Sequence, residues 1–372
     1  MKVIIFRDYK EENWHSMEVY ADELIRHLRL LKISGLYIQA HVTLPTLSAL
    51  FPSSKKYMRQ FFRYIVNPMG SWFQHGDIFH ITDHANTQLI PALDPSRTIV
   101  TCHYLTAPYW MMEHVPLTAK KRIRHAVERW RLDFLKRAAG IIAVSHATKQ
   151  HIVDALGIPA SKITVIPEGV DELFYRVTEK LKLRNGIKRL RLPNKYILHV
   201  GTTYYNKNIE GLLRIFFTLA KKDSELYLVK SGDPWTPEQE NMIQTSGFSK
   251  RVWHMGFVAT SDLPIIYSLA RVLIQPSFAE GFGFPVLEAM ACGCPVVVSD
   301  IPAMHEMVRD AGLYIDPSPT KQHIREITAL IASPAKRKAM ALLGYRRAAT
   351  YSWEKTAQKT YALYAKVAQG RK

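Results

Sequence analysis

The feature that most constrains the fold is an alternation of short apolar runs with amphipathic, helix-forming segments, which occurs twice along the 372 residues. Such an alternation is typical of a parallel sheet covered by helices on both faces. The first series of expected strands lies at residues 3–6, 37–44, 77–81, 97–102, 140–144 and 162–166, with helices at 17–31, 118–139 and 146–156. The second series begins at Tyr196 and runs through the apolar segments YILHV, ELYLV, RVWHM and RVLIQ.

A basic segment closed by a proline, VTEKLKLRNGIKRLRLP at residues 177–193, separates the two series. We interpret it as a linker between domains. The sequence therefore predicts two α/β domains of similar size, residues 1–175 and 176–352. After Asp316 the chain is expected to be helical, with a last helix at about 353–367.

The formal net charge of +18 is the unusual number in the composition. A balance of this kind favours acidic partners, which include nucleic acid, anionic lipid and phosphorylated substrates. Three cysteines form no disulfide framework, so Cys102, Cys292 and Cys294 are interpreted as small core residues. No secretory signal and no uninterrupted apolar run of about 20 residues is visible. We expect a cytoplasmic protein, either free or on the cytoplasmic face of a membrane.

The stretch PSFAEGFGFPVLEAMACGCPVVVSD, residues 276–300, predicts the chemistry most directly. It follows a strand and reads as a glycine-punctuated loop, a helix and a second strand. Glu280 and Glu288 bracket the helix start, roughly 10 Å apart at about 1.5 Å per residue. Gly281 and Gly283 let the backbone approach an anion at that helix terminus. The alternative interpretation is an ordinary packed βαβ unit with a solvated glutamate.

Other phosphate-binding signatures do not occur. Gly281-Phe282-Gly283 does not continue as GxGxxG, and no GxxxxGK[ST] loop is present. The chain also lacks an Asp-x-Asp pair, the usual sign of a metal-clamped diphosphate. We therefore expect side chains and helix dipoles, rather than a metal ion, to neutralise a bound phosphate.

Several segments taken together resemble the retaining glycosyltransferases of family 4. They are AVSHATKQHIVDALGIPASKITVIPEGVD, HVGTTYYNKN, VWHMGFVATSDLPIIYSLARVLIQPS, EGFGFPVLE as an E-x7-E motif, AGLYIDP and YSWEKTA. The resemblance implies the α/β GT-B fold, with two Rossmann-like domains facing across a cleft and a C-terminal helix, about 353–372, crossing back to the first domain. It also implies transfer of a hexose from a nucleotide sugar to a hydroxyl of a glycan or lipid-linked acceptor, with retained configuration and no metal or other cofactor.

The resemblance assigns roles to individual residues. Glu280 would contact the donor sugar, Glu288 the ribose hydroxyls, and Lys207 the diphosphate, while His103 would lie beside the reacting sugar. Asn206 stands where the family usually has arginine. The remaining residues expected on the donor side are Thr202, Thr203, Val258, Gly281, Phe282, Gly283, Phe284 and Val286, together with Asn206.

The acceptor side is predicted from the first domain. Ser16 and Met17 stand where many relatives carry paired glycines, so geometry there departs from the family's usual form. His80, Asp83 and His84 cluster near the end of a strand and could serve the acceptor, or could be satisfied loop residues. Ser145 is interpreted as the N-cap of the helix that follows it.

Residues 55–66, KKYMRQFFRYIV, carry apolar and cationic side chains on different helical faces. This pattern is what an interfacial helix needs in order to bind anionic lipid, although a core-facing helix shows it too. Two other functions stay open at this point. One is a sugar-nucleotide-binding protein without catalysis, and the other is a basic nucleic-acid-binding protein, which scattered charges without a recognised module disfavour.

Overall fold

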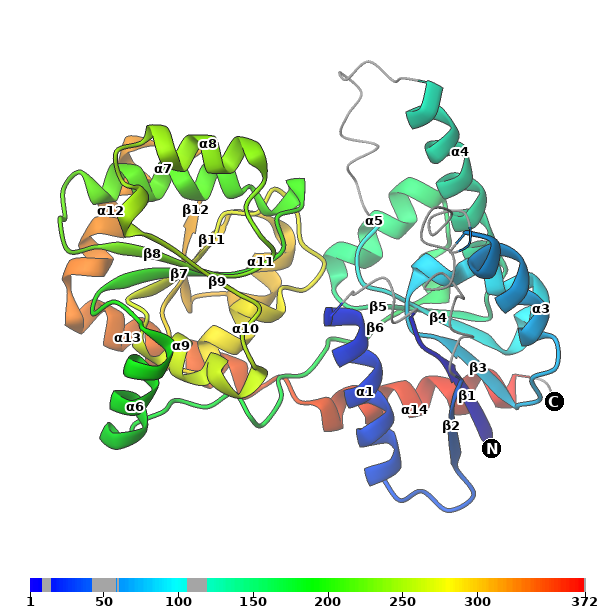
Figure 1. The fold of residues 1–372 in the computed structure, drawn as a ribbon. Helices are drawn as coiled ribbons and strands as arrows, with labels where there is room; N and C mark the ends of the chain where they lie inside the picture. Colours follow the sequence, from blue (N-terminus) through cyan, green and yellow to red (C-terminus); the bar gives the residue numbers. More distant parts are fainter. Residues whose placement is uncertain (9–14, 42–57, 59, 106–118, 371–372) are drawn as a thin grey trace. The chain divides into compact units, whose positions relative to one another are not determined.

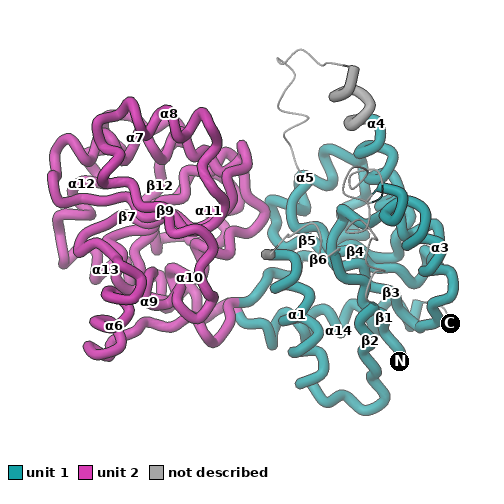
Figure 2. Tube along the Cα trace, in the orientation of Figure 1, with its two compact units in different colours: residues 1–169, 352–372 teal, residues 170–351 magenta. Residues whose placement is uncertain are grey.

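The computed structural model describes residues 1–8, 15–41, 58, 60–105 and 119–370. They form two compact units, which Figure 2 colours separately: unit 1 comprises residues 1–169 and 352–372, and unit 2 residues 170–351. The sequence-based division between residues 175 and 176 lies close to this change at Gly169. The two α/β units correspond to the predicted GT-B architecture.

Unit 1 is built on a six-stranded parallel sheet in the order β2-β1-β3-β4-β5-β6. The inner strands β3, β4 and β5 are fully buried, as expected for a sheet covered on both faces, while the edge strands β2 and β6 are partly exposed. Figure 1 shows helices α1 (His15–Leu30) and α14 (Trp353–Gln369) beside this sheet. The strands are β1 (Lys2–Phe6), β2 (Tyr37–His41), β3 (Ile78–Ile81), β4 (Thr98–Cys102), β5 (Gly140–Ala143) and β6 (Ile163–Val165). The other helices are α3 (Asn67–Ser71), α4 (Ala119–Asp133) and α5 (His146–Leu156).

Unit 2 repeats the arrangement with a second six-stranded parallel sheet in the order β12-β11-β10-β7-β8-β9. Its strands are β7 (Tyr196–Gly201), β8 (Tyr227–Gly232), β9 (Val252–Gly256), β10 (Val272–Gln275), β11 (Val296–Ser299) and β12 (Gly312–Ile315). Its helices are α6 (Lys180–Leu190), α7 (Ile209–Ala220), α8 (Pro237–Thr245), α9 (Leu263–Leu269), α10 (Phe284–Ala291), α11 (Pro302–Val308), α12 (Lys321–Ala332) and α13 (Pro334–Ala348).

Two predictions about segments are wrong. Residues 177–193 were interpreted as a linker, but they contain helix α6, which belongs to unit 2. Its Gly186 lies so close to Ile265 of α9 that an added Cβ would approach Ile265 Cγ2 to 2.8 Å. This basic helix therefore packs against α9 within unit 2 and is not an extended linker. The connection between β3 and β4, for which no helix was predicted, is the 3₁₀ helix His84–Ala92.

Other predictions are confirmed in detail. All three cysteines are buried and unpaired. Ser145 caps α5 by accepting a hydrogen bond from the Thr148 N–H at 3.0 Å. Helix α14, at the C-terminal end of the chain, belongs to unit 1. No helix among the described residues is long and apolar enough to cross a membrane.

The topology determines where ligands can bind. Since every neighbouring pair of strands is parallel, all carboxyl ends in a unit meet at one edge of its sheet. Ligands of open α/β sheets bind at that edge. The segments after β7, β8 and β10 in unit 2, and after β1, β3 and β4 in unit 1, are therefore the places to look for function.

Candidate functional site

Glu280, in the loop between β10 and α10, is held by three side-chain donors of unit 2. The ammonium of Lys207 lies 2.7 Å from Oε1 and 2.9 Å from Oε2 of its carboxylate. Ser277 and Gln275 donate to Oε1 at 2.7 Å and 3.1 Å. Only 7% of the Glu280 side chain is exposed. The structure thus brings together two residues predicted as catalytic, Lys207 and Glu280, in a largely buried ion pair.

A short turn before α7 positions Lys207. Asn208 adopts a left-handed conformation with φ of 51°, caps α7 by accepting from the Gly211 N–H, and donates to the carbonyl of Pro276 at 2.9 Å. Helix α7 consequently begins at Ile209, directly after this turn. Asn206 donates to the carbonyl of Ala279 at 3.2 Å. Asn206 therefore ties the Lys207 turn to the Glu280 loop. The arginine that the family usually has at this position would add a positive charge there.

Helix α10 begins after Gly283, whose φ of 101° is one that glycine adopts without strain. Its first turn offers fewer donors to an anion than the sequence suggests. The Val286 N–H donates to the carbonyl of Gly283 at 3.0 Å, and Pro285 has no N–H. The Val286 N–H is therefore already used within the helix. The Phe282 side chain is buried, 5.7 Å from the Phe284 ring centre.

Glu288, on the same helix, accepts a hydrogen bond from the Tyr267 hydroxyl at 2.7 Å. Burial raises the pKa of Glu288 to about 7, although the Tyr267 hydrogen bond acts in the opposite direction. The two glutamates of the E-x7-E motif thus have different surroundings. Glu280 is paired with a cation, and Glu288 is a carboxyl group that changes charge near neutral pH.

The loops after β7 and β9 contain the other residues that were predicted to bind the sugar-nucleotide donor. The Thr203 N–H donates to the Asp233 carboxylate at 3.2 Å. The Thr202 hydroxyl is buried and has no partner among the described residues. Val258 lies half-buried after β9. Gly201 and Gly232 are register partners at the ends of β7 and β8, and a Cβ on Gly232 would lie 2.2 Å from the Gly201 carbonyl oxygen.

Beneath these loops lies a row of basic residues that the sequence analysis missed. His199, Lys230 and His254 are register partners across β7, β8 and β9. Lys230 is fully buried, donates to the Asp233 carbonyl and lies 5.0 Å from the centre of the Trp235 ring. Burial lowers the pKa of Lys230 to about 8 and that of His199 to about 3. A charged residue within an apolar strand run was the signal that could have revealed Lys230.

In unit 1, His103 follows β4, and both of its ring nitrogens contact protein atoms. Nδ1 lies 2.7 Å from the Glu168 carboxylate, and Nε2 lies 2.8 Å from the Thr82 carbonyl. Although burial lowers it, the hydrogen bond and the charge of Glu168 raise the pKa of His103 to about 9. His103 is therefore an imidazolium held by two acceptors, which makes it an electrostatic group rather than a free base.

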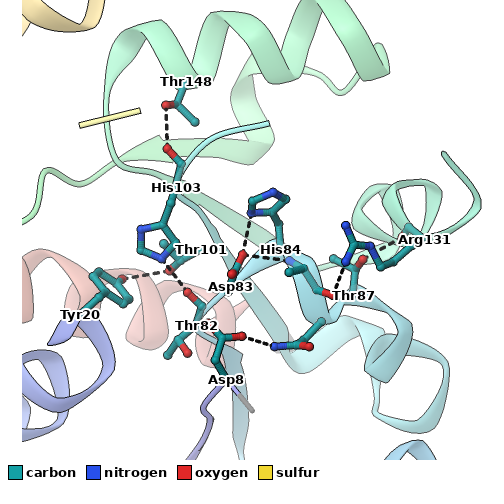
Figure 3. Close-up of polar contacts among 12 residues, drawn as sticks. Asp8, Tyr20, Thr82, Asp83, His84, Thr87, Thr101, His103, Arg131 and Thr148 are labelled. Carbon is teal, nitrogen blue, oxygen red and sulfur yellow. Dashed lines mark hydrogen bonds and ion pairs between the residues drawn. The ribbon is translucent and has the colours of Figure 1, made fainter. Parts of the chain in front are cut away.

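Figure 3 shows His103 close to Asp8, Asp83 and His84, and the charges of these residues interact in one polar network. These residues follow β4, β1 and β3, which are neighbours in the sheet. Asp83 Oδ1 accepts from the Ala85 N–H at 2.9 Å and lies 2.8 Å from His84 Nδ1. Although burial acts to raise it, the neighbouring His84 holds the pKa of Asp83 far below its usual value. The predicted acceptor residue His84 thus pairs with an ionised aspartate.

The other predicted acceptor residues lie elsewhere. His80 is inside β3, not after it, and is buried between the Tyr364 hydroxyl at 2.6 Å and the Thr101 hydroxyl at 2.8 Å. Burial lowers its pKa to about 3, so it is a neutral core residue. Ser16 and Met17 lie in the first turn of α1, where Ser16 is exposed. Most of the preceding loop, residues 9–14, lies outside the described residues.

Asp8 and Glu168 are the members of this network that sequence reasoning missed. Asp8 comes two residues after β1, and a polar residue directly after a buried strand is a signal that could have found it. Glu168, by contrast, is 65 positions from His103, and no local pattern connects the two residues.

Comparison with known proteins covers both units. The family model described as "Glycosyltransferase Family 4" matches residues 17–172, and "Glycosyl transferases group 1" matches residues 185–347. The chain is 30% identical over 275 residues to "O-antigen chain mannosyltransferase B" of Escherichia coli, which covers 72% of this chain and 70% of the relative. It is 26% identical to "Serotype-specific mannosyltransferase WbdA" of Escherichia coli, over 81% of this chain and 37% of that protein.

Solved structures share the fold at low sequence identity. HepE of Anabaena in complex with UDP and glucose superimposes with a TM-score of 0.74 at 20% identity, covering 98% of this chain and all of that one. Sucrose-phosphate synthase of Thermosynechococcus elongatus gives a TM-score of 0.72 at 19% identity, with 99% of both chains covered. At such identities the likeness shows a common architecture.

Proposed function

The chain belongs to glycosyltransferase family 4, and from this membership we propose that it transfers a hexose from a nucleotide sugar to a hydroxyl of a glycan or lipid-linked acceptor, with retained configuration and without a metal ion. The observation that supports this best is the Lys207–Glu280 pair beside the start of α10. It places a cation, a carboxylate and a helix N-terminus within one loop system. Such a set suits a sugar diphosphate, whose sugar carries hydroxyls and whose phosphates carry charge.

Lys207 is proposed to stabilise the leaving diphosphate. An ammonium has three N–H donors, and the two hydrogen bonds to Glu280 leave one for a phosphate oxygen. The developing charge on the leaving group is then met by Lys207 and by the start of α10. An oxygen of that diphosphate, on the same face of the sugar as the acceptor hydroxyl, can accept the proton of the hydroxyl, so the step needs no separate base.

The other site residues are proposed to hold the donor. Glu280, fixed by Lys207 and Ser277, would accept hydrogen bonds from hydroxyls of the transferred sugar. Glu288 would accept from the ribose, with Tyr267 orienting it. The names of the relatives support mannose as the sugar and a polysaccharide as the acceptor class, while the HepE complex supports a uridine nucleotide.

A panel of sugar nucleotides tests this proposal. We expect one of GDP-mannose, UDP-glucose, ADP-glucose and dTDP-glucose to raise the thermal midpoint selectively, because a ligand that binds only the folded state stabilises it. The same compound should be consumed in the presence of EDTA. Binding without hydrolysis or transfer would instead identify a sugar-nucleotide-binding protein, and no binding at all would contradict the proposal.

We also propose that unit 1 docks on an anionic membrane that carries the acceptor. Within residues 58–73, four side chains at helical spacing are about half exposed: Phe61 48%, Ile65 47%, Met69 50% and Trp72 61%. Arg63, a cationic residue of the predicted interfacial segment, donates to the Ala85 carbonyl at 2.8 Å and is held by unit 1. Residues 55–57 and 59 lie outside the described residues. The exposed stripe supports an apolar insertion surface.

Vesicle sedimentation tests this surface. Changing Phe61 and Ile65 to serine should reduce binding to phosphatidylglycerol vesicles at least tenfold. The matched control is Phe257→Ser, because Phe257 is 74% exposed in unit 2. Equal vesicle binding by both variants and the wild type would contradict the membrane proposal and would leave the transferase proposal unaffected.

A further inference from the structure

The turn before α7 exposes two tyrosines to which the proposed mechanism gives no role. Tyr204 is 59% exposed and Tyr205 is 66% exposed. Both lie in the segment that leads from β7 to α7, at the carboxyl edge of the unit 2 sheet. Burying an aromatic side chain would stabilise the protein, and ligands of such sheets bind at this edge. The two exposed rings are therefore candidates for contact with a ligand.

Tyr205 is fixed on the same two loops as the Lys207–Glu280 pair. Its ring stacks on that of Phe278, with the ring centres 5.2 Å apart and an angle of 28° between the planes. The next residue, Asn206, accepts from the Phe278 N–H at 2.8 Å through its backbone carbonyl. Lys207 then pairs with Glu280. Three consecutive residues of the turn thus contact the Glu280 loop, so Tyr205 is held in place before any ligand binds.

The free face of the Tyr205 ring is open to solvent. Phe278 covers one face, and two thirds of the Tyr205 side chain remains exposed. The face of an aromatic ring is electronegative, while the C–H groups on one side of a pyranose ring are weakly electropositive and apolar. The phenol hydroxyl can also donate to or accept from a sugar hydroxyl. The open face therefore suits a sugar ring and disfavours an anion.

The position of the stack along the chain indicates which sugar it would meet. Phe278 precedes Glu280, the residue proposed to hold the transferred sugar, by two positions, and two residues span at most about 7 Å. Glu288, proposed to hold the ribose, follows Glu280 on helix α10. The donor would thus extend from Glu280 along α10, and a ring stacked on Tyr205 would belong to the acceptor.

We propose that Tyr205, backed by Phe278, is a stacking platform for a sugar ring of the acceptor. The hydroxyl that is glycosylated then belongs to a saccharide, which names the acceptor class. Because the platform is ordered in advance, binding the ring costs little further ordering of the protein. The inference rests on the proposed transferase function, since it assigns this surface to the acceptor of that reaction.

Three variants separate stacking from other roles. Tyr205→Ala removes the platform, whereas Tyr205→Phe keeps the aromatic face and removes the hydroxyl. Tyr345→Ala is the matched control, because Tyr345 is a 54% exposed tyrosine of the same unit that lies on α13.

Saturation-transfer NMR measures binding without requiring turnover. The probes are the methyl α-glycosides of mannose, glucose, galactose and N-acetylglucosamine, each added with the nucleoside diphosphate of the sugar nucleotide that the protein binds. In the wild type, one probe should receive most saturation on the C–H protons of one ring face. Tyr205→Ala should weaken its binding at least fivefold, while Tyr205→Phe and Tyr345→Ala should stay within twofold of the wild type.

Transfer kinetics with the same probe provide a second measurement. Tyr205→Ala should raise the KM for the glycoside by a similar factor and leave kcat within twofold, because the platform binds the acceptor but does not act on the leaving group. The thermal shift caused by the sugar nucleotide should not change in this variant.

Three results would overturn the inference. They are equal binding of the probe by Tyr205→Ala and the wild type, no saturation of any probe in the wild type, and loss of the sugar-nucleotide thermal shift in Tyr205→Ala. The last result would mean that the ring holds the donor instead. Absence of that thermal shift in the wild type would indicate failure of the proposed function.

Discussion

Lys207 and Glu280 are 73 positions apart in the sequence, yet their charged groups lie 2.7 Å apart. The spacing of the E-x7-E motif indicates two carboxylates around a helix start, but it does not reveal that one of them is paired with a lysine. Asn208 and Asn206, which tie the two loops together, make that pairing possible. At the scale of single residues, the chemistry of each carboxyl group is set by its donors.

Lys207→Ala should lower turnover by about 10²-fold or more, which is the size of effect expected when one preorganised donor is removed. The rate of sugar transfer at saturating donor measures it. Lys221→Ala, an exposed lysine just after α7, is the control and should leave the rate unchanged. If Lys207→Ala also behaved like wild type, the diphosphate would have to be held elsewhere.

Glu288 should make nucleotide affinity depend on pH. Its raised pKa, about 7, keeps it protonated in the free protein below neutrality, and a carboxylate accepts ribose hydrogen bonds better than the acid does. Affinity for the nucleoside diphosphate should therefore rise between pH 6 and 8. Titration calorimetry of the wild type and of Glu288→Gln measures this pH dependence. The protonation of the ligand's own phosphate affects both proteins equally, so the difference between them reports on Glu288. Identical pH dependence in both proteins would refute the assignment.

Stability should move in the opposite direction over this range. The native state holds a proton on Glu288 between the unfolded value of 4.5 and about 7, while the unfolded chain does not. The contribution of Glu288 to the free energy of unfolding therefore falls as the pH rises through this window.

Among the elements, β7 and β8 meet at two glycines that bring their backbones into close approach. Gly232 has φ of 116° and faces the Gly201 carbonyl, so Gly232→Ala meets both backbone strain and a clash. We expect it to destabilise unit 2 by more than the roughly 1–3 kcal/mol of strain alone. Gly247→Ala is the control, because Gly247 also has positive φ, 77°, but open space around it. Urea unfolding measures the loss of stability in each variant. Equal losses in the two variants would contradict the close approach of the β7 and β8 backbones.

The sequence predicted elements well where period and burial agree, as in α5 and the central strands, since an apolar run bounded by turn residues has few alternatives in an α/β protein. It failed at α6, whose basic composition resembles a linker although Gly186 packs on α9. The candidate site was predictable where a motif holds it, at Glu280, Lys207 and Glu288. It was not predictable where distant loops converge, as Asp8, Asp83 and Glu168 do, because only the strand order brings them together.

At the scale of the whole molecule, unit 2 is one continuous segment while unit 1 needs both ends of the chain. Helix α14 completes unit 1 through buried contacts. Tyr364 hydrogen-bonds His80 in β3, Thr356 donates to the Pro167 carbonyl at 2.8 Å, and Trp353 packs 5.8 Å from the Tyr20 ring centre. The C-terminal segment is thus a structural part of the N-terminal unit.

A chain ending at Tyr351 should therefore lose the folding of unit 1 and keep that of unit 2. Removing two buried aromatic side chains, Trp353 and Tyr364, at about 3–5 kcal/mol each, approaches the whole stability of a typical domain, about 5–15 kcal/mol. Calorimetry should show one transition that the sugar nucleotide still shifts. A control chain ending at Gly370 should behave as the full chain does. Two intact transitions in the shorter chain would contradict the account.

The anomeric configuration of the product tests whether the protein transfers the sugar with retention and without a metal ion. The protein is incubated with the α-linked sugar nucleotide that it binds and with a methyl glycoside acceptor in the presence of EDTA, and the new linkage is identified from its ¹H–¹³C one-bond coupling. We predict an α-linked product, formed at the same rate with and without the chelator. A β-linked product, or transfer that requires added Mg²⁺ or Mn²⁺, would contradict it.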